Sequence, residues 1–237
     1  VRDDGLDPII RWSFGKVGYA LHKRTTGELP LVCMIRYPAS YPESKYLDWR
    51  QLPGRNGKKR WVSGSPNAMK YDKLLSKDTA RNTWLVDKMI EARAKDRNIL
   101  IFARHRNHIK VLHDEFVKRY AILRSTTTYP ETTAALLWGG IKDKERKIAS
   151  VANLIFTTHS YAREAFNATH LDTLIFASPA GDPLQPAGRL RDKGDKGRKS
   201  LLIIDPFEGN DYSYRKATRR KKAYEDLGMK VKRLKKS

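Results

Sequence analysis

Five short apolar runs, separated by stretches with helical periodicity, limit the possible folds of this chain more than any other feature. Each run holds three to five consecutive apolar residues and shows no alternation with polar ones. Runs of this kind are typical of strands that are buried on both faces of a parallel sheet. Their alternation with helices predicts an α/β fold with a doubly wound, mainly parallel sheet. The runs span residues 99–103, 134–138, 153–157, 173–177 and 201–204.

Four segments between and around these runs show the spacing of amphipathic helices. Asn107 can cap a helix whose apolar residues recur every three or four positions. A helix near residues 78–95 precedes the first run, a short basic helix covers residues 143–149, and Gly228 can end a helix that begins near Tyr212. The apolar faces of the two longer helices before the second run contain Leu85, Val86, Met89 and Ile90, and Ile109, Leu112, Phe116 and Tyr120.

Residues 38–70 have a different composition, rich in Pro, Gly, Ser, Tyr and basic residues. No period is sustained there, so we expect a loop inserted into the α/β domain. One interpretation is a solvated connector. The other is a loop that contacts DNA, because Trp49, Trp61 and Tyr71 lie among the positive charges.

The composition favours a polyanionic partner. The chain of 237 residues has 48 Lys and Arg against 26 Asp and Glu, a net charge of +22. Nucleic acid is the commonest partner of so basic a protein, and an acidic membrane surface is the competitor. No apolar run approaches the roughly 20 residues of a membrane span. Cys33 is the only cysteine, so we expect no disulfide within the chain and a reducing, cytoplasmic location. The six histidines show no paired metal spacing, so we expect no structural metal.

The segment 185–191 combines a glutamine, a glycine and two arginines between two apolar runs. The arginine guanidinium stays charged and its planar fork of donors matches phosphate oxygens. Arg189 and Arg191, at the edge of a parallel sheet, suit the stabilisation of a transferring phosphoryl group. A basic surface helix without such a role is the other interpretation.

An ordered set of motifs resembles superfamily 2 helicases, in particular the XPB-like, phage UvsW-like and poxvirus-type transcript-release branch. The segment 185–191 resembles motif VI, Q-x-x-G-R-x-x-R, and residues 158–167 resemble motif V, T-y-x-x-A-x-E-G-x-D. Residues 138–140 with Arg146 resemble motif IVa. The remaining matches are the segment after motif III (residues 2–6 and 14–17), the R-N signal (81–82) and motif IV (99–104 with His108).

The resemblance implies the second RecA-like lobe of a helicase. Residues 1–30 would be the end of the first lobe and a linker, residues 31–228 the second lobe with the loop insert 38–70, and residues 229–237 a basic tail. No G-x-x-x-x-G-K-[ST] phosphate loop occurs in the chain. The expected cofactor is therefore ATP whose magnesium is held by the first lobe of the same protein, and residue 1 is not expected to be the native start.

The resemblance also assigns the nucleotide-contacting residues. Arg189 matches the first arginine of motif VI and is the expected arginine finger. Arg191 departs from the pattern, because Asp192 stands where the second arginine normally lies. The remaining expected contacts to the nucleotide are Gln185, Gly188, Glu164 and Asn167, although Ala165 and Asn167 replace a glycine and an aspartate of motif V.

The expected contacts to the tracked nucleic-acid strand come from three other motifs. Thr158 and the backbone at Gly139 and Gly140 would hold phosphates through a hydroxyl and a helix N-terminus. Lys142 adds a charge beside them. Arg104 and His105 follow the first strand, where motif IV approaches nucleic acid.

These residues predict an ATP-dependent DNA helicase or translocase of phage or viral type, which binds single-stranded or branched DNA in a prokaryotic or virus-infected cell. The chain alone is expected to be inactive. The alternative is a non-enzymatic nucleic-acid-binding module derived from a helicase lobe, and the changes in motif V favour it. A Rossmann dinucleotide enzyme is excluded because no G-x-G-x-x-G follows the first run. His108 is expected to pack in the core, and Asp205, which lies outside the motifs, to cap a turn.

Overall fold

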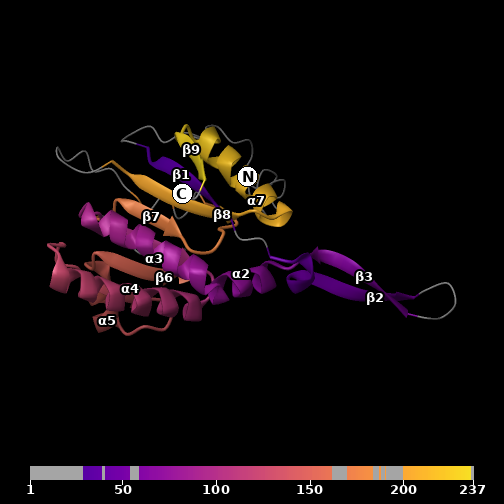
Figure 1. The fold of residues 1–237 in the computed structure, drawn as a ribbon, viewed down its shortest axis with the longest axis horizontal. Coiled ribbons are helices and arrows are strands. Elements are labelled where there is room, and N and C mark those ends of the chain that lie inside the picture. Colours follow the sequence, from indigo (N-terminus) through magenta and orange to yellow (C-terminus); the bar gives the residue numbers. More distant parts are fainter. Residues whose placement is uncertain are drawn as a thin grey trace, which may run out of the picture.

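A seven-stranded, wholly parallel sheet forms the centre of the computed structural model (Figure 1). The structure describes residues 29–38, 41–53, 59–161, 170–183, 187, 190 and 200–235. The strand order is β5-β6-β4-β7-β8-β1-β9. The strands are β1 (Leu31–Tyr37), β4 (Ile99–Ala103), β5 (Ala134–Leu137), β6 (Leu154–Thr158), β7 (Thr173–Phe176), β8 (Leu202–Glu208) and β9 (Val231–Lys235).

The five apolar runs are confirmed as five strands of this sheet, β4 to β8. Two further strands, β1 and β9, were not predicted. Strand β9 pairs in parallel with β1, from Val32 opposite Val231 to Arg36 opposite Lys235. The prediction of a basic tail is therefore wrong for residues 231–235. Strand β9 contains no apolar run, because it is a largely exposed edge strand of mostly basic residues.

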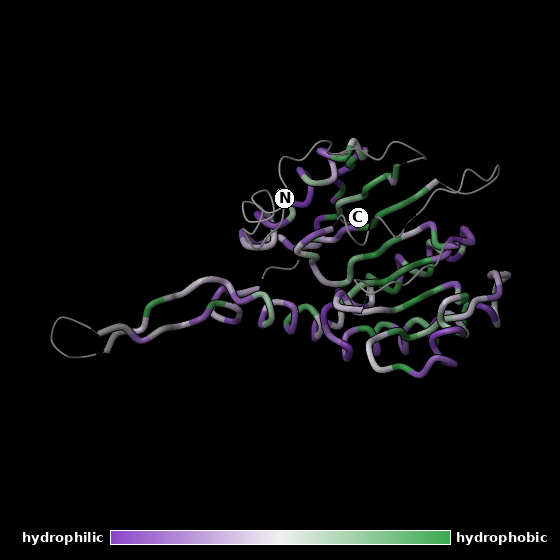
Figure 2. Tube along the Cα trace, turned by 180° about the vertical axis from the view of Figure 1, so that it is seen from behind, coloured by the Kyte–Doolittle hydropathy of each residue, from purple (hydrophilic) through white to green (hydrophobic). Residues whose placement is uncertain are grey.

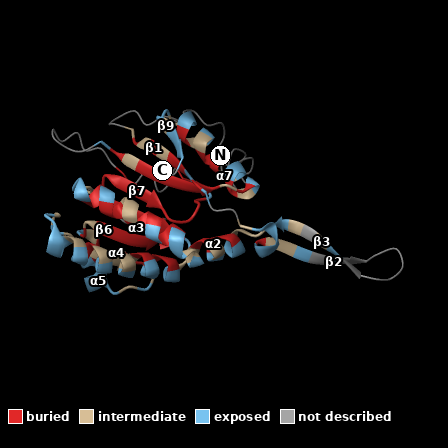
Figure 3. Cartoon of the chain, in the orientation of Figure 1, coloured by how far each residue is buried: buried red, intermediate tan, exposed pale blue. Residues whose placement is uncertain are grey.

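Helices cover both faces of the sheet, as a doubly wound fold requires. Helices α3 (Thr79–Ala94) and α4 (Arg106–Thr126) pack on one face, and α5 (Asp143–Ser150) and α7 (Asp211–Asp226) pack on the other. Strand β4 divides its side chains accordingly, with Ile101 in the α3–α4 core and Phe102 in the α5–α7 core. Figure 2 shows the central strands of the sheet among the most hydrophobic parts of the chain, and Figure 3 shows these strands buried between the helices.

The helix boundaries follow from local capping. Helix α3 begins after Asp78, whose carboxylate accepts a hydrogen bond from the Arg81 backbone N–H at 2.8 Å. Helix α4 begins at Arg106 with His105 as its N-cap, so the predicted cap at Asn107 is wrong by two residues. After α7 the chain turns at Gly228, whose φ of 80° favours glycine.

The insert is a β-hairpin, so the prediction of a loop is wrong for residues 47–53 and 59–66. Strands β2 (Leu47–Pro53) and β3 (Lys59–Pro66) pair antiparallel and project from the lobe (Figure 1). A 3-10 turn, η1 (Glu43–Lys45), precedes them, and helix α2 (Ala68–Lys77) connects them to α3. Tyr71 lies on α2 and is buried against Tyr46 and Leu75, so this aromatic residue is not available to a ligand.

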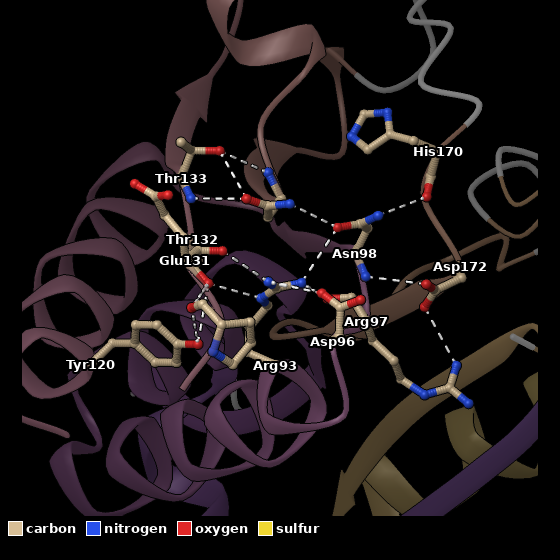
Figure 4. A network of polar contacts seen from close by, with 12 residues as sticks. Arg93, Asp96, Arg97, Asn98, Tyr120, Glu131, Thr132, Thr133, His170 and Asp172 are labelled. Atoms are coloured by element: carbon tan, nitrogen blue, oxygen red, sulfur yellow. Dashed lines mark hydrogen bonds and ion pairs between the residues drawn. The ribbon is translucent and has the colours of Figure 1, made fainter. Parts of the chain in front are cut away.

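A polar network closes the edge of the sheet where the strands begin (Figure 4). The buried guanidinium of Arg93, at the end of α3, donates to the Thr132 hydroxyl at 3.0 Å and to the Arg97 carbonyl at 2.7 Å. Asn98 donates to the His170 carbonyl at 3.2 Å, and its backbone N–H donates to Asp172 at 3.1 Å. These bonds join the starts of β4, β5 and β7 at one edge of the sheet.

Asp205 does not cap a turn, contrary to expectation. It lies inside β8 and is fully buried. Its carboxylate accepts two hydrogen bonds from the Arg220 guanidinium, at 2.8 and 2.9 Å, and one from the Tyr224 hydroxyl at 3.1 Å. This ion pair fixes α7 on the sheet.

Candidate nucleic-acid interface

The carboxyl ends of three neighbouring strands bring the predicted nucleic-acid contacts together. Strand β6 lies between β5 and β4, with Thr158 opposite Ala103 and Thr157 opposite Leu137. The residues that follow β4 and β5 therefore lie on either side of Thr158, at one edge of the sheet. We call this the carboxyl-edge site. It contains all six predicted contacts: Arg104, His105, Gly139, Gly140, Lys142 and Thr158.

Backbone and side-chain bonds hold the loops of this site in place. The His159 backbone N–H donates to the Ala103 carbonyl at 3.2 Å, and the Arg104 N–H donates to the Ser178 hydroxyl at 3.2 Å. The Arg106 guanidinium donates to the Gly139 carbonyl at 3.1 Å. The loops after β4, β5, β6 and β7 are thus joined to one another, which keeps their polar groups at fixed positions.

Thr158 is less accessible than its predicted role requires. Only 3% of its surface is exposed, and its hydroxyl lies 3.2 Å from that of Ser160. Ser160 itself is exposed. Ser160 is therefore the hydroxyl of this pair that solvent or a ligand can reach, and Thr158 is its buried partner. Ser160 was not predicted as a contact. It could have been, because it lies two residues beyond the end of β6, where polar side chains reach the edge of the sheet.

Arg104 forms an ion pair with Asp72 of helix α2. Burial raises the pKa of the Asp72 carboxyl, and the adjacent guanidinium of Arg104 partly counteracts that rise. The Arg104 side chain remains 39% exposed. Arg104 therefore links the carboxyl-edge site to α2 while part of its guanidinium fork stays open to solvent.

The two glycines after β5 leave open space at the edge. A Cβ atom built on either Gly139 or Gly140 would meet no other atom within 4 Å, and Gly140 has a φ of 91° that favours glycine. The exposed Lys142 follows as the N-cap of α5 and makes no capping bond with its side chain. The first turn of α5 contains Asp143 and Glu145, whose charges oppose an anion there. Lys142, rather than the helix N-terminus, is thus the group best suited to a phosphate.

A cavity of about 550 Å³ lies beside the site, between α2 and the start of α4. It is lined by three lysines of α2 and by two histidines, one at the N-cap of α4 and one in its first turn. The lysines give this lining positive charge, although Lys70 is paired with Asp48, and Met69 and Val111 add apolar surface. Its lining includes Lys70, Lys73, Lys77, His105, His108 and Val111.

His108 is a buried core histidine, as expected. Its Nε2 lies 2.9 Å from Asn82 Oδ1, and Nδ1 has no hydrogen-bond partner among the described residues. Burial, with the nearby charge of Arg81, lowers the pKa of His108 to about 3. The ring is therefore neutral at physiological pH.

The pH dependence of stability tests this state. In the unfolded chain His108 takes up a proton near its ordinary pKa, whereas the folded chain does not. Stability is therefore fully present above about pH 6.5 and falls by about 1.4 kcal/mol per pH unit as the pH decreases towards 3. When the pH is lowered from 7 to 5, the free energy of unfolding of wild type should fall by about 2 kcal/mol more than that of His108→Gln, which has no histidine to protonate at this position. Urea titrations at the two pH values measure this, and equal losses would contradict it.

The predicted nucleotide contacts lie outside the described residues. These are Gln185, Gly188, Arg189, Arg191, Glu164 and Asn167. Within the same segment, Ala187 and Leu190 are described and are buried in the α5–α7 core. The role of each of the six residues stays a prediction.

In the described part of the chain, no group of three His, Cys, Asp or Glu residues is arranged to hold a metal ion. None of the described helices is both long and apolar enough to cross a membrane.

The parallel sheet, its two helical layers and the polar carboxyl edge define a RecA-like α/β lobe. The α/β fold with its seven-stranded parallel sheet is similar to the C-terminal lobe of helicases of known structure. T4 UvsW is similar with a TM-score of 0.59 and 15% identity, over 87% of this chain and 41% of that one. S. cerevisiae Dbp5 L327V, solved with RNA and ADP BeF3, gives a TM-score of 0.53 and 11% identity, over 99% of this chain and 49% of that one.

A distant sequence relative is a viral protein named "Putative ATP-dependent RNA helicase QP509L", from African swine fever virus. The two are 26% identical over 108 residues. The aligned region is 45% of this chain and 20% of the viral protein, so the chain corresponds to a small part of its relative. No family model matches the chain.

Proposed function

We propose that the chain is the C-terminal lobe of an ATP-dependent superfamily 2 helicase or translocase that moves along DNA. The observation that carries this proposal is the carboxyl-edge site, where the loops after three neighbouring strands present polar and basic groups together. The net charge of +22 supports a polyanionic ligand. A first RecA-like lobe would hold ATP and magnesium, and Arg189 would meet the γ-phosphate from this lobe.

The phosphate backbone is the part of the ligand that the site is suited to bind. Lys142, Ser160 and the open backbone at Gly139 offer a charge, a hydroxyl and amide groups, none of which distinguishes one base from another. Binding should therefore depend little on sequence. The same groups suit DNA and RNA, and our choice of DNA rests on the likeness of the motifs to the UvsW-like branch.

Nucleic-acid binding should depend strongly on salt. If the chain neutralises around six phosphates, its affinity should fall about a thousandfold between 50 and 200 mM salt. Fluorescence anisotropy with labelled single-stranded DNA and RNA of the same sequence measures both the affinity and the slope of log K against log salt. A salt-independent affinity, or a strong preference for one sequence, would contradict the proposal, and tighter RNA binding would overturn the choice of DNA.

A pair of lysine variants locates the binding surface. Lys142→Ala should weaken binding and reduce the salt slope by about one, because one phosphate contact is lost. Lys95→Ala is the matched control, since Lys95 is equally solvent-exposed but follows α3 at the opposite edge of the sheet. It should bind as wild type does. Equal effects of the two variants would place the nucleic acid elsewhere.

A further inference from the structure

The β2–β3 hairpin presents two exposed tryptophans on a single face. Trp49 is opposite Ser63 and Gln51 is opposite Trp61 in the antiparallel register. Paired residues share a face, and so do alternate residues of one strand, so Trp49 and Trp61 are diagonal neighbours. Their exposed fractions are 49% and 62%. The hairpin projects beyond the sheet, with neither tryptophan in any of the hydrophobic clusters (Figure 3).

The charge around these tryptophans favours a nucleic acid over a protein partner. Between residues 45 and 70 the sequence has seven Lys or Arg residues and a single acidic one, Asp48. The core of a protein–protein interface is typically depleted of lysine. Tryptophan beside many cations is instead the combination that binds unpaired bases, by stacking on the rings, and their phosphates, by charge.

The hairpin is connected to the carboxyl-edge site by a basic helix. Lys70, Lys73 and Lys77 of α2 line the cavity that His105 also lines. Lys70 forms an ion pair with Asp48 of β2 at 2.9 Å, so the same helix contacts the hairpin. Helix α2 therefore joins the carboxyl-edge site to the base of the hairpin, and Lys73 and Lys77 add positive charge along it.

The base of the hairpin is fixed to the core. Tyr46 and Tyr71 pack edge to face at 5.1 Å, and the Tyr71 hydroxyl donates to the buried carboxylate of Glu208, at the end of β8, at 2.9 Å. A Cβ on Gly64 would lie 2.4 Å from the Asp48 carbonyl oxygen, so the close approach of the two strands there requires glycine. The hairpin is thus held in one direction relative to the carboxyl-edge site.

We propose that Trp49 and Trp61 form a stacking platform for unpaired bases of the nucleic-acid strand that occupies the carboxyl-edge site. This inference rests on the proposed function, because the strand must first be bound at that site. The platform binds bases without reading their sequence, since every base offers a ring face. The lysines of α2 contact the phosphates that connect the two places.

An abasic ligand separates stacking from charge. We compare the 237-residue chain with Trp49→Ala, Trp61→Ala and the double variant, on labelled oligo(dT) and on an abasic oligonucleotide of equal length. Each single variant should weaken oligo(dT) binding about tenfold, and the double variant should bind both ligands alike. The salt slope should not change, because no phosphate contact is removed. Trp49→Phe and Trp61→Phe should retain most of the affinity.

Ile122→Ala is the matched control, an exposed apolar side chain on α4 away from the hairpin. It should bind both ligands as wild type does. If wild type binds neither ligand, the proposed function fails and this inference fails with it. If wild type binds both but the double variant keeps the preference for oligo(dT), only the stacking platform is overturned. A reduced salt slope in the tryptophan variants would also overturn it.

Discussion

Arg189→Ala should reduce ATP turnover about a thousandfold or more in a protein that contains both lobes, while nucleic-acid affinity stays nearly unchanged. An arginine finger meets negative charge that develops only as the phosphoryl group transfers. Its loss therefore raises the barrier, by roughly 4 kcal/mol, without weakening the binding of the tracked strand. The measurement is DNA-stimulated phosphate release, with affinity for single-stranded DNA determined in parallel.

Arg191→Ala is the internal comparison for this prediction. It should have a smaller effect, because Asp192 stands where the family pattern has its second arginine. Normal turnover by Arg189→Ala together with lost turnover by Arg191→Ala would show that the finger was assigned to the wrong residue. Normal turnover by both variants would leave a binding module as the better description of the chain.

Asp205→Ala should destabilise the lobe by about 3–5 kcal/mol, because it leaves the Arg220 guanidinium buried without a counter-ion. Both side chains are almost completely buried, and two hydrogen bonds join them. Burial alone would lower the pKa of Arg220, but the Asp205 carboxylate more than offsets this and raises it. Arg220 therefore stays charged, and Asp205 is the counter-ion that offsets the cost of burying that charge. Chemical denaturation measures the loss of free energy of unfolding.

Two controls separate the buried charge from other effects of the substitution. Glu225→Ala removes the partner of Lys221 on the same helix, where both side chains are partly exposed, and should cost about 1 kcal/mol or less. The double variant Asp205→Leu, Arg220→Met should recover much of the stability, since no unpaired charge remains. A double variant that is as unstable as Asp205→Ala would argue against the unpaired charge as the cause.

Apolar runs predicted five of the seven strands of the sheet. Strands β4, β6 and β7 are buried at every position, and the runs in β5 and β8 were recognisable although β5 is only partly buried and β8 also contains Asp205 and Glu208. Strand β9 and the hairpin could not be recognised in this way. Both have largely exposed or strongly basic strands, and their pairing depends on partners that no local pattern reveals, such as β1 for β9. For Asp205, the buried partner lies fifteen residues along the chain, on a helix.

The position of the candidate site was predictable, but its details were not. Residues after parallel strands meet at one edge whatever their identity, so Arg104, Gly139 and Thr158 could be placed together from sequence. Their individual environments depend on packing. The ion pair of Arg104 with Asp72, and the burial of Thr158 beneath Ser160, result from helix α2 and from a turn that the motifs do not encode.

The hydrogen bond between Tyr71 and Glu208 couples the hairpin mechanically to the core of the lobe. Glu208 also accepts hydrogen bonds from Ser213 of α7, at 2.8 Å, and from Arg81 of α3, at 2.8 Å. One buried carboxylate thus joins a sheet strand and helices from both faces to the helix that carries the hairpin. The hairpin cannot turn separately without breaking these bonds. Any rotation of the lobe therefore carries β2 and β3 with it, and because displacement grows with distance from the axis, these projecting strands would move farther than the base of the hairpin (Figure 1).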